Sequence, residues 1–398
     1  MGREVHKFLV DQSGNRPWVG FPYPPLITCD WLNGLPEEDA LYDASENLVS
    51  KTKYYYNYTS VASRPYDPNE KIVSGIKIDI GVLPLYCYAN ETLTPVEFVE
   101  GQFTLLSSWH YLKGKEEARR DTEGQMVTTT TDYFYEDPVH IQKTSEQTTD
   151  SKGRRYITYF SYPLDYAGDV MNGSIAALNT ANIITPVVSA IDLVNNLVVG
   201  SVVNELNAVG NPVSVYQLET SRPLSDFLSP SKNPIGLFTG YMQDTRYKKR
   251  VNFLYNSKQD VVEISNDFGD VTSYLWGVQG SHPIAEIKNA TYNQVSSALG
   301  TSLLNDLYVN PYADADIRSK LSLLRSAPSL TAARSTIITY HPNGAISSMT
   351  DPNGRMQFFF FDNANRLESI KDHNQNIISA FKYHYRESAH PPKDNPQY

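Results

Sequence analysis

Cysteine is scarce in this sequence. Cys29 and Cys87 are the two cysteines among 398 residues, too few for a disulfide scaffold and too isolated for a zinc site. They either pair in an oxidising compartment or remain unpaired as small hydrophobic residues. The sequence leaves both states open.

Long hydrophobic runs are missing as well. The most apolar stretch, residues 183–203, is interrupted by Pro186 and Asp192, so we expect no membrane-spanning segment. The first residues, Met1 to Lys7, lack the apolar segment of a signal peptide.

Positive charge is in deficit. The 34 Lys and Arg residues face 44 Asp and Glu residues, which gives a net charge of −10. Nucleic acids and anionic membranes attract basic surfaces. We therefore expect neither of them as a partner.

Common catalytic and metal-binding motifs are absent too. None of the 8 histidines has a His-x-x-x-His spacing, and no Gly-x-Ser-x-Gly elbow or phosphate loop occurs. We expect no enzyme activity, no cofactor and no metal.

One acidic group keeps an enzymatic alternative open. It lies beside Trp31 and Tyr42, and glycosidases combine paired acids with aromatic platforms. The simpler interpretation is a solvated acidic loop. The acidic residues are Asp30, Glu37, Glu38, Asp39 and Asp43.

Tyrosine, by contrast, is abundant. The chain has 28 Tyr, and aromatic residues make up 12% of it. Tyr favours half-buried strands, where its ring packs and its hydroxyl stays hydrated. The composition predicts a mainly β protein whose exposed aromatics could bind glycans or peptides. The candidates for such a ligand surface are Trp31, Tyr54, Tyr56, Tyr58, Trp109 and Trp276.

Short alternating runs between Gly, Asn, Asp and Pro residues predict many strands. Helical periodicity appears near residues 173–183 and within an insert at 290–333. Asn195 and Asn196 predict a tight hairpin, because Asn tolerates the left-handed conformation. Strands are predicted over residues 4–10, 48–58, 103–112, 126–135, 154–162, 187–194, 197–206, 213–220, 250–255, 261–265, 271–276 and 283–288, and again from 335 to 385.

A repeat runs through the last strands. Phe361 follows Tyr340 by 21 residues, and Tyr383 follows Phe361 by 22. Asp351 and Asp372 keep the same step of 21 residues. Two strands and two turns fill about 20 residues, so each period is one β-hairpin. Fainter copies lie at 42–48 and 255–261, where we expect a turn one residue longer.

These segments resemble the RHS/YD-repeat proteins. The family signature Tyr-Asp-x-x-Gly-Arg-Leu is similar to residues 361–367, and its Thr-Asp-Pro-Asn-Gly spacer is similar to residues 350–354. The segments 108–112, 274–277 and 282–291 resemble members from Bacteroidota. The repeat-signature residues are Tyr340, Gly344, Asp351, Gly354, Phe361, Asp362, Arg366, Leu367 and Tyr383.

The resemblance implies a spiral or shell of stacked hairpins in a large bacterial protein at the cell surface or secreted. Some family members enclose a C-terminal toxin and release it by self-cleavage. This sequence shows no such cleavage motif after residue 385 and no effector domain. We expect the C-terminal portion of a longer protein, or a short relative of one.

The predicted fold is a mainly β antiparallel sheet of YD-type hairpins with small helical inserts. Its parts are a β-rich region (1–240), a YD-repeat region (241–385) and a flexible tail (386–398).

The predicted function is a non-enzymatic structural or interaction module with protein partners. The alternatives are the shell of a polymorphic toxin that lacks its effector, and a carbohydrate-binding or carbohydrate-active surface protein.

Overall fold

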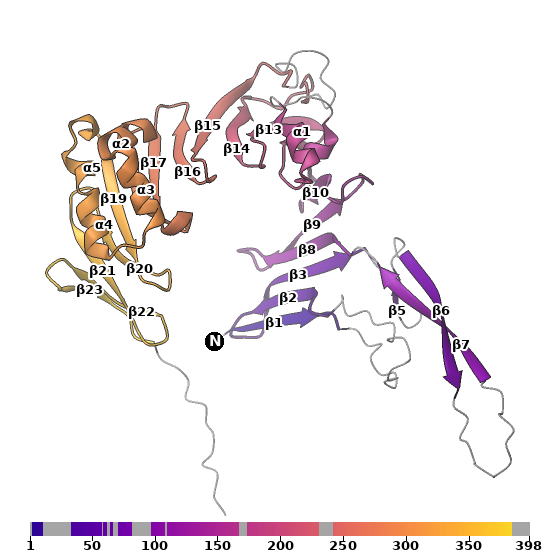
Figure 1. Ribbon diagram of the computed structural model, residues 1–398. Helices are drawn as coiled ribbons and strands as arrows, with labels where there is room; N and C mark the ends of the chain where they lie inside the picture. The colour runs from indigo at the N-terminus through magenta and orange to yellow at the C-terminus, as the bar shows by residue number, and fades with distance from the viewer. Residues whose placement is uncertain are drawn as a thin grey trace, which may run out of the picture. The chain divides into compact units, whose positions relative to one another are not determined.

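The computed structural model describes residues 2–10, 33–57, 59–61, 64–66, 71–81, 97–107, 110–166, 173–230 and 242–383 (Figure 1). The predicted tail and both cysteines lie outside the described residues. Hydrogen bonds join 19 strands into an antiparallel sheet, and two further strand pairs are separate from it. The prediction of a mainly β, antiparallel fold is confirmed.

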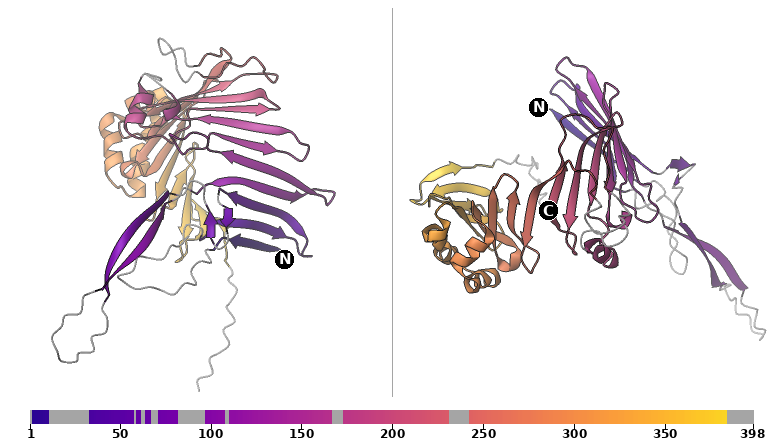
Figure 2. Two further views of the ribbon diagram at one scale, coloured as in Figure 1. Left: turned by 90° about the vertical axis from the view of Figure 1, so that its right-hand side faces the viewer. Right: turned by 90° about the horizontal axis from the view of Figure 1, so that it is seen from above.

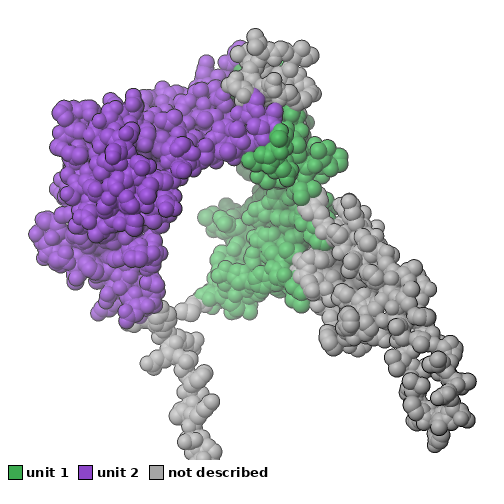
Figure 3. Space-filling model, viewed as in Figure 1, with its two compact units in different colours: residues 1–170, 179–201, 220–244 green, residues 171–178, 202–219, 245–398 purple. Residues whose placement is uncertain are grey.

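Contacts divide the chain into two units, coloured separately in Figure 3. Unit 1 comprises residues 1–170, 179–201 and 220–244, and unit 2 comprises residues 171–178, 202–219 and 245–398.

Unit 1 is a ladder of strands in which most strands pair with their neighbours in the chain (Figure 2). Two strand pairs, β4–β5 and β6–β7, interrupt the order, so that β3 pairs with β8. The paired order is β1 (Arg3–Phe8), β2 (Pro36–Tyr42), β3 (Leu48–Tyr56), β8 (Leu112–Arg120), β9 (Met126–Phe134), β10 (Ser145–Thr149), β11 (Arg155–Ser161) and β12 (Ser189–Val194). The separate pairs are β4 (Thr59–Val61) with β5 (Arg64–Tyr66), and β6 (Lys71–Gly81) with β7 (Glu97–Ser107).

Unit 2 continues as a meander with a helical insert. Strand β13 (Leu197–Leu206) begins in unit 1 and ends in unit 2, and helix α1 (Ser174–Thr180) also has residues in both. The strands that follow are β14 (Pro212–Leu218), β15 (Tyr247–Tyr255), β16 (Val261–Asn266), β17 (Val271–Gly277), β18 (His282–Lys288), β19 (Arg334–Tyr340), β20 (Ile346–Thr350), β21 (Met356–Phe361), β22 (Leu367–Asp372) and β23 (Ile377–Ala380).

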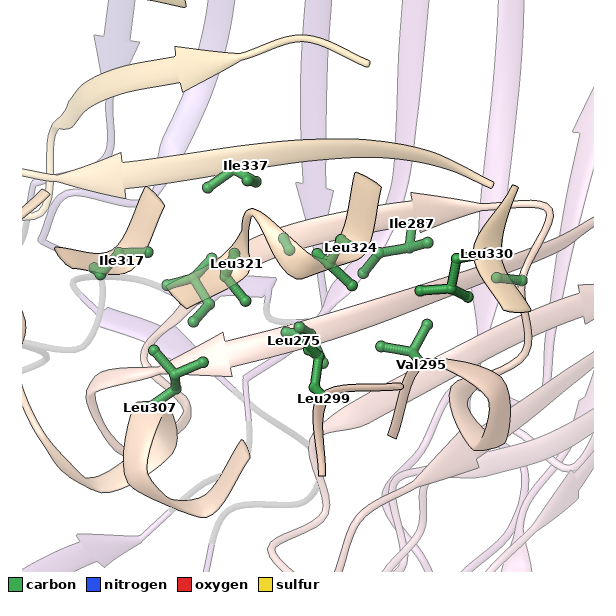
Figure 4. Packing of buried hydrophobic residues seen from close by; sticks show 13 residues of the cluster. Leu275, Ile287, Val295, Leu299, Leu307, Ile317, Leu321, Leu324, Leu330 and Ile337 are labelled. Atoms are coloured by element: carbon green, nitrogen blue, oxygen red, sulfur yellow. The ribbon is translucent and has the colours of Figure 1, made fainter. Parts of the chain in front are cut away.

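The insert between β18 and β19 forms an apolar core with the sheet of unit 2. Its helices are α2 (Tyr292–Leu299), α3 (Thr301–Val309), α4 (Asp314–Leu321) and α5 (Leu323–Ser326). Leu321 and Leu324 from the helices pack against a sheet face that includes Leu275 and Ile337 (Figure 4). Helix α2 begins with a capping box, in which Thr291 and Gln294 exchange side-chain and backbone hydrogen bonds. Both predicted helical regions are therefore helical.

One turn geometry recurs between the strands. In the turn after Phe361, the Asp362 carboxylate accepts backbone N–H groups of Ala364 and Arg366 at 2.9 and 3.0 Å. Asn365 is left-handed with φ 56°. This is a three-residue hairpin loop, in which a short polar side chain satisfies the turn amides. Two backbone hydrogen bonds close this turn, because the Asp362 N–H donates to the Arg366 carbonyl and the Asn365 N–H donates to the Asp362 carbonyl, both at 2.9 Å. The same pair of backbone hydrogen bonds closes the turns that start at Asp43, Asp121, Asp150, Asn207, Asn256, Asn266, His341, Asp351, Asp362 and Asp372.

The structure corrects the prediction of longer turns at 42–48 and 255–261. Their left-handed residues are Glu46 and Gln259, at the same position as Asn365 in the Asp362 turn. Glu and Gln rarely adopt the left-handed conformation. The sequence therefore suggested Asn47 and Asp260 as the left-handed residues, which made each turn one residue too long. The tight turn predicted at Asn195 and Asn196 is confirmed, with φ 49° and 66°.

Candidate functional site

In the predicted aromatic ligand surface, the polar side-chain atoms of the described residues form hydrogen bonds with neighbouring strands of the sheet. The Tyr54 hydroxyl donates to Asp39 at 2.8 Å, and the Tyr56 hydroxyl donates to the Pro36 carbonyl at 2.9 Å. The Trp276 indole N–H donates to the Val261 carbonyl at 2.7 Å. All three side chains are half-buried. The other candidates, Trp31, Tyr58 and Trp109, lie outside the described residues.

Three members of the acidic group proposed near Trp31, namely Glu37, Glu38 and Asp39, lie in strand β2 rather than in a loop, and Asp43 starts the turn that follows β2. The buried Glu38 carboxylate binds Lys51 at 2.6 Å and Lys7 at 2.8 Å, and these contacts lower its pKa. Asp39 binds His6 at 2.7 Å, which together with Tyr54 lowers its pKa.

A glycosidase general acid needs a raised pKa so that it holds a proton at neutral pH. Glu38 and Asp39 are held in the opposite state, as charged partners of neighbouring strands. Asp30 lies outside the described residues.

The repeat-signature residues connect neighbouring strands. Arg366 forms an ion pair with Asp362 at 2.6 Å and lies over the Tyr383 ring, 4.6 Å from its centroid. The Tyr383 hydroxyl donates to the Leu367 carbonyl at 2.8 Å. The Tyr340 hydroxyl likewise donates to the Pro283 carbonyl at 2.9 Å. These two tyrosine hydroxyls therefore connect neighbouring segments of the sheet. Of the remaining signature residues, Gly344 and Gly354 hold left-handed turn positions, Asp351 starts a turn, and Phe361 ends β21.

A cavity of about 760 Å³ lies in unit 1, where β11 ends. The chain leaves β11 into a short 3-10 helix, Pro163–Asp165, and leaves β9 into a loop that begins at Tyr135. Residues of both segments and of strands β11 and β12 line the cavity, among them Glu136, Asp137, Tyr159, Asp165, Tyr166 and Ser189.

Buried hydroxyls occupy one wall of this cavity. Ser161 Oγ lies 2.8 Å from the Tyr166 hydroxyl and 2.5 Å from Ser189 Oγ. Burial raises the pKa of the Tyr166 hydroxyl, so it remains a neutral hydrogen-bond donor. The network joins β11 to β12, since each buried hydroxyl satisfies another.

Two carboxylates and an imidazole converge beside the cavity. His140 Nε2 lies 3.6 Å from Asp137 Oδ2 and 3.5 Å from Asp165 Oδ2. The three ligand-type atoms all lie within 4.8 Å of one another. The His140 side chain is 1% exposed, and its Nε2 has no hydrogen-bond partner. We call these three residues the Asp-His-Asp cluster.

Local backbone contacts fix both carboxylates. Asp137 Oδ1 accepts the Val139 N–H at 2.7 Å, which turns its other oxygen toward His140. Asp165 Oδ2 accepts the Tyr162 N–H at 2.8 Å, as an N-terminal cap of the 3-10 helix. The cluster is therefore held in place by the turns that end β9 and β11.

The Asp-His-Asp cluster was not among the predicted sites. The spacing Asp137-Pro-Val-His140 was a signal in the sequence, but Asp165 is 25 residues beyond His140. The pairing of β9, β10 and β11 brings the two segments together. An Asp and a His separated by two residues do not predict a metal site unless the strand pairing is also known.

No family model matches this chain, and no curated protein matches it. Among solved structures, a crystal structure of TcdB2-TccC3-TEV is 13% identical with a TM-score of 0.25, over 87% of this chain and 19% of that one. A Photorhabdus luminescens Tc holotoxin pore is 12% identical with a TM-score of 0.23, over 88% and 19%. A porin-like protein from Bacteroides uniformis is 10% identical with a TM-score of 0.16, over 84% and 87%. At these TM-scores the likeness carries no argument about function.

Within the described residues, no helix is long and apolar enough to cross a membrane.

Proposed function

We propose that this chain is a non-enzymatic structural and interaction module of an RHS-like repeat protein, located at a bacterial cell surface or secreted. The observation that carries the proposal is the recurring turn. The same backbone hydrogen bonds close hairpins from Asp43 to Asp372, as expected for a chain built by repetition of one unit.

The contacts between hairpins support a scaffold rather than a reaction centre. The hydroxyls of Tyr340 and Tyr383 donate hydrogen bonds to backbone carbonyls, and Arg366 forms an ion pair with Asp362. Side chains engaged in this way stabilise the ladder and leave few polar atoms for a substrate.

The interaction surface that we propose is the last described strand, β23. Among the described strands β23 pairs only with β22, so its other edge presents backbone N–H and C=O groups. Ile377 and Ile378 on this strand are 64% and 51% exposed. An apolar edge of this kind suits a further strand of the same repeat type.

The edge is tested by the association of purified chains. We expect wild-type protein to self-associate through β23 as its concentration rises, measured by sedimentation velocity. The double substitution Ile377→Lys and Ile378→Lys should reduce this association at least about tenfold, because Lys blocks edge pairing. The control is Phe268→Lys, an apolar position that is 81% exposed and lies in the turn that starts at Asn266. A double variant that associates like wild type would argue against β23 as the interface.

Localisation is tested on the source cells. Protease treatment of intact cells should remove an epitope-tagged chain from the surface, or the chain should be found in the medium. A chain that stays protected until lysis contradicts the surface assignment. Hydrolysis of a glycan panel that is lost in Glu38→Gln would instead favour the carbohydrate-active alternative.

A further inference from the structure

The Asp-His-Asp cluster contains a buried imidazole whose Nε2 atom forms no hydrogen bond, which an ordinary ion pair does not explain. Its imidazole is almost completely buried, and Nε2 has no hydrogen-bond partner. Buried polar atoms are normally satisfied, so an unsatisfied one needs a physical reason. Here the unsatisfied atom faces two carboxylate oxygens.

The geometry points to a metal site: we propose that Asp137, His140 and Asp165 bind a first-row divalent cation of the Zn²⁺ type. Bonds of about 2.0–2.2 Å at a tetrahedral angle place ligand atoms about 3.4 Å apart. The distances from His140 Nε2 to Asp137 Oδ2 and Asp165 Oδ2, 3.6 and 3.5 Å, are close to this spacing between ligand atoms. This proposal is independent of the proposed scaffold function.

The donor types select the class of cation. Imidazole suits Zn²⁺ and its neighbours, whereas Mg²⁺ and Ca²⁺ prefer sites made of oxygen atoms. Two carboxylates also neutralise the charge of a divalent ion. Three protein ligands leave a fourth position for water or another small ligand. Asp137 and Asp165 both line the cavity, so that position faces it.

Neighbouring residues hold the His140 ring in place. Tyr162 packs edge-on against His140, with ring centroids 5.3 Å apart, and its hydroxyl donates to the Lys143 carbonyl at 2.8 Å. One contact must change on binding. The Gln142 N–H donates to His140 Nδ1 at 3.3 Å, and a neutral imidazole that binds metal through Nε2 carries its proton on Nδ1. This long contact therefore opens when the cation binds.

The proposal is tested by equilibrium dialysis of the full chain against Zn²⁺ after removal of metals and of any affinity tag. We expect one Zn²⁺ per chain, retained when Cys29 and Cys87 are replaced by Ser, and no comparable binding of Mg²⁺ or Ca²⁺. Asp137→Asn, His140→Ala and Asp165→Asn should each lower the affinity at least about tenfold. His373→Ala, outside the cluster, should leave it unchanged.

A second readout separates lost ligands from lost structure. Zn²⁺ should raise the melting temperature of the wild-type chain, because the assembled site binds it more tightly than the unfolded chain does, and should not raise that of Asp137→Asn. Asp137 is partly exposed and Asn can keep its turn contact, so this variant should fold even if His140→Ala does not. Zn²⁺ binding below one per chain in folded wild type overturns the proposal. Stoichiometric binding that Asp137→Asn and Asp165→Asn leave unchanged places the ion elsewhere and overturns it as well.

Discussion

The first and fourth residues of each turn determine whether a hairpin can close. The first residue is Asp or Asn in all the recurring turns except the one that starts at His341. The fourth is left-handed, usually Gly, as at Gly354 with φ 84°. A side chain at that position costs energy through its backbone conformation even where space is free.

Gly354 isolates this backbone effect, because a Cβ atom there would meet nothing within 4 Å. We expect Gly354→Val to destabilise the β20–β21 hairpin by about 1–2 kcal/mol. Gly354→Asn should cost clearly less, since Asn365 occupies the same position in the next turn. Hydrogen exchange of β20 and β21 measures the difference. Equal protection in both variants would show that conformation at this position does not limit the turn.

The turn carboxylates predict an acid-sensitive fold. Arg366 lowers the pKa of Asp362, and Asn376 lowers that of Asp372. Backbone N–H groups lower the pKa of Asp43 and Asp150. A lowered folded pKa means that the stabilisation is complete above the ordinary value of 3.8 and is lost as the pH falls through the folded pKa.

We therefore expect the melting temperature to fall below about pH 4. Replacing all four Asp residues by Asn should flatten this dependence, because Asn cannot titrate. Asn207, Asn256 and Asn266 already start turns of the same geometry, so the replacement keeps the turn. Thermal melts from about pH 7 to about pH 3 provide the comparison. Parallel profiles for the two proteins would place the acid sensitivity in other groups.

At the scale of elements, the burial of side chains in the helical insert follows the helical periodicity of its sequence. Adjacent leucines in α5 have opposite environments, with Leu324 2% and Leu323 46% exposed. Their difference in burial follows from helical periodicity, and it makes them a matched pair for a packing test.

We expect Leu324→Ala to cost about 2–5 kcal/mol through lost burial and the cavity left behind. Leu323→Ala should stay within about 0.5 kcal/mol of wild type. Urea unfolding, followed by hydrogen exchange of β17, β18 and β19, reports both effects. Similar losses in both variants would mean that the insert does not pack as described.

The sequence predicted most of the strands and missed β2, β10 and nearly all of β8. Strand β8 reads Leu-Lys-Gly-Lys-Glu-Glu-Ala-Arg-Arg, and β10 reads Ser-Glu-Gln-Thr-Thr. Neither has an apolar face, and both are held by backbone pairing to neighbouring strands. No strand was predicted between residues 58 and 103, yet β6 lies there, and its partner β7 begins before residue 103, where the predicted strand starts. Pairing partners far along the chain cannot be read from local pattern.

At the scale of the whole molecule, a sheet of sequential hairpins should respond to damage locally. Gly114 in β8 is buried, and a Cβ there would lie 2.9 Å from the Thr131 carbonyl oxygen in β9. A bulky residue at this position must separate the two strands. In repeat-like arrays, stability is carried by each unit and its immediate neighbours.

We expect Gly114→Val to increase hydrogen exchange in β3, β8 and β9 and to leave the β17–β19 core unchanged. Gly124→Asn, in the turn between β8 and β9 with φ 83°, is the control with little expected effect. Increased exchange throughout both units would show global cooperativity and contradict the local picture.

The ends of the helical insert carry one more consequence. Lys288 and Arg334 face each other as paired residues of β18 and β19. The chain thus leaves and re-enters the sheet at one rung, as it does at the short turns. A whole helical subdomain occupies the place of a hairpin loop without altering strand order. This position is therefore suited to domain insertion: a foreign domain whose termini lie close together could replace the helical insert between β18 and β19.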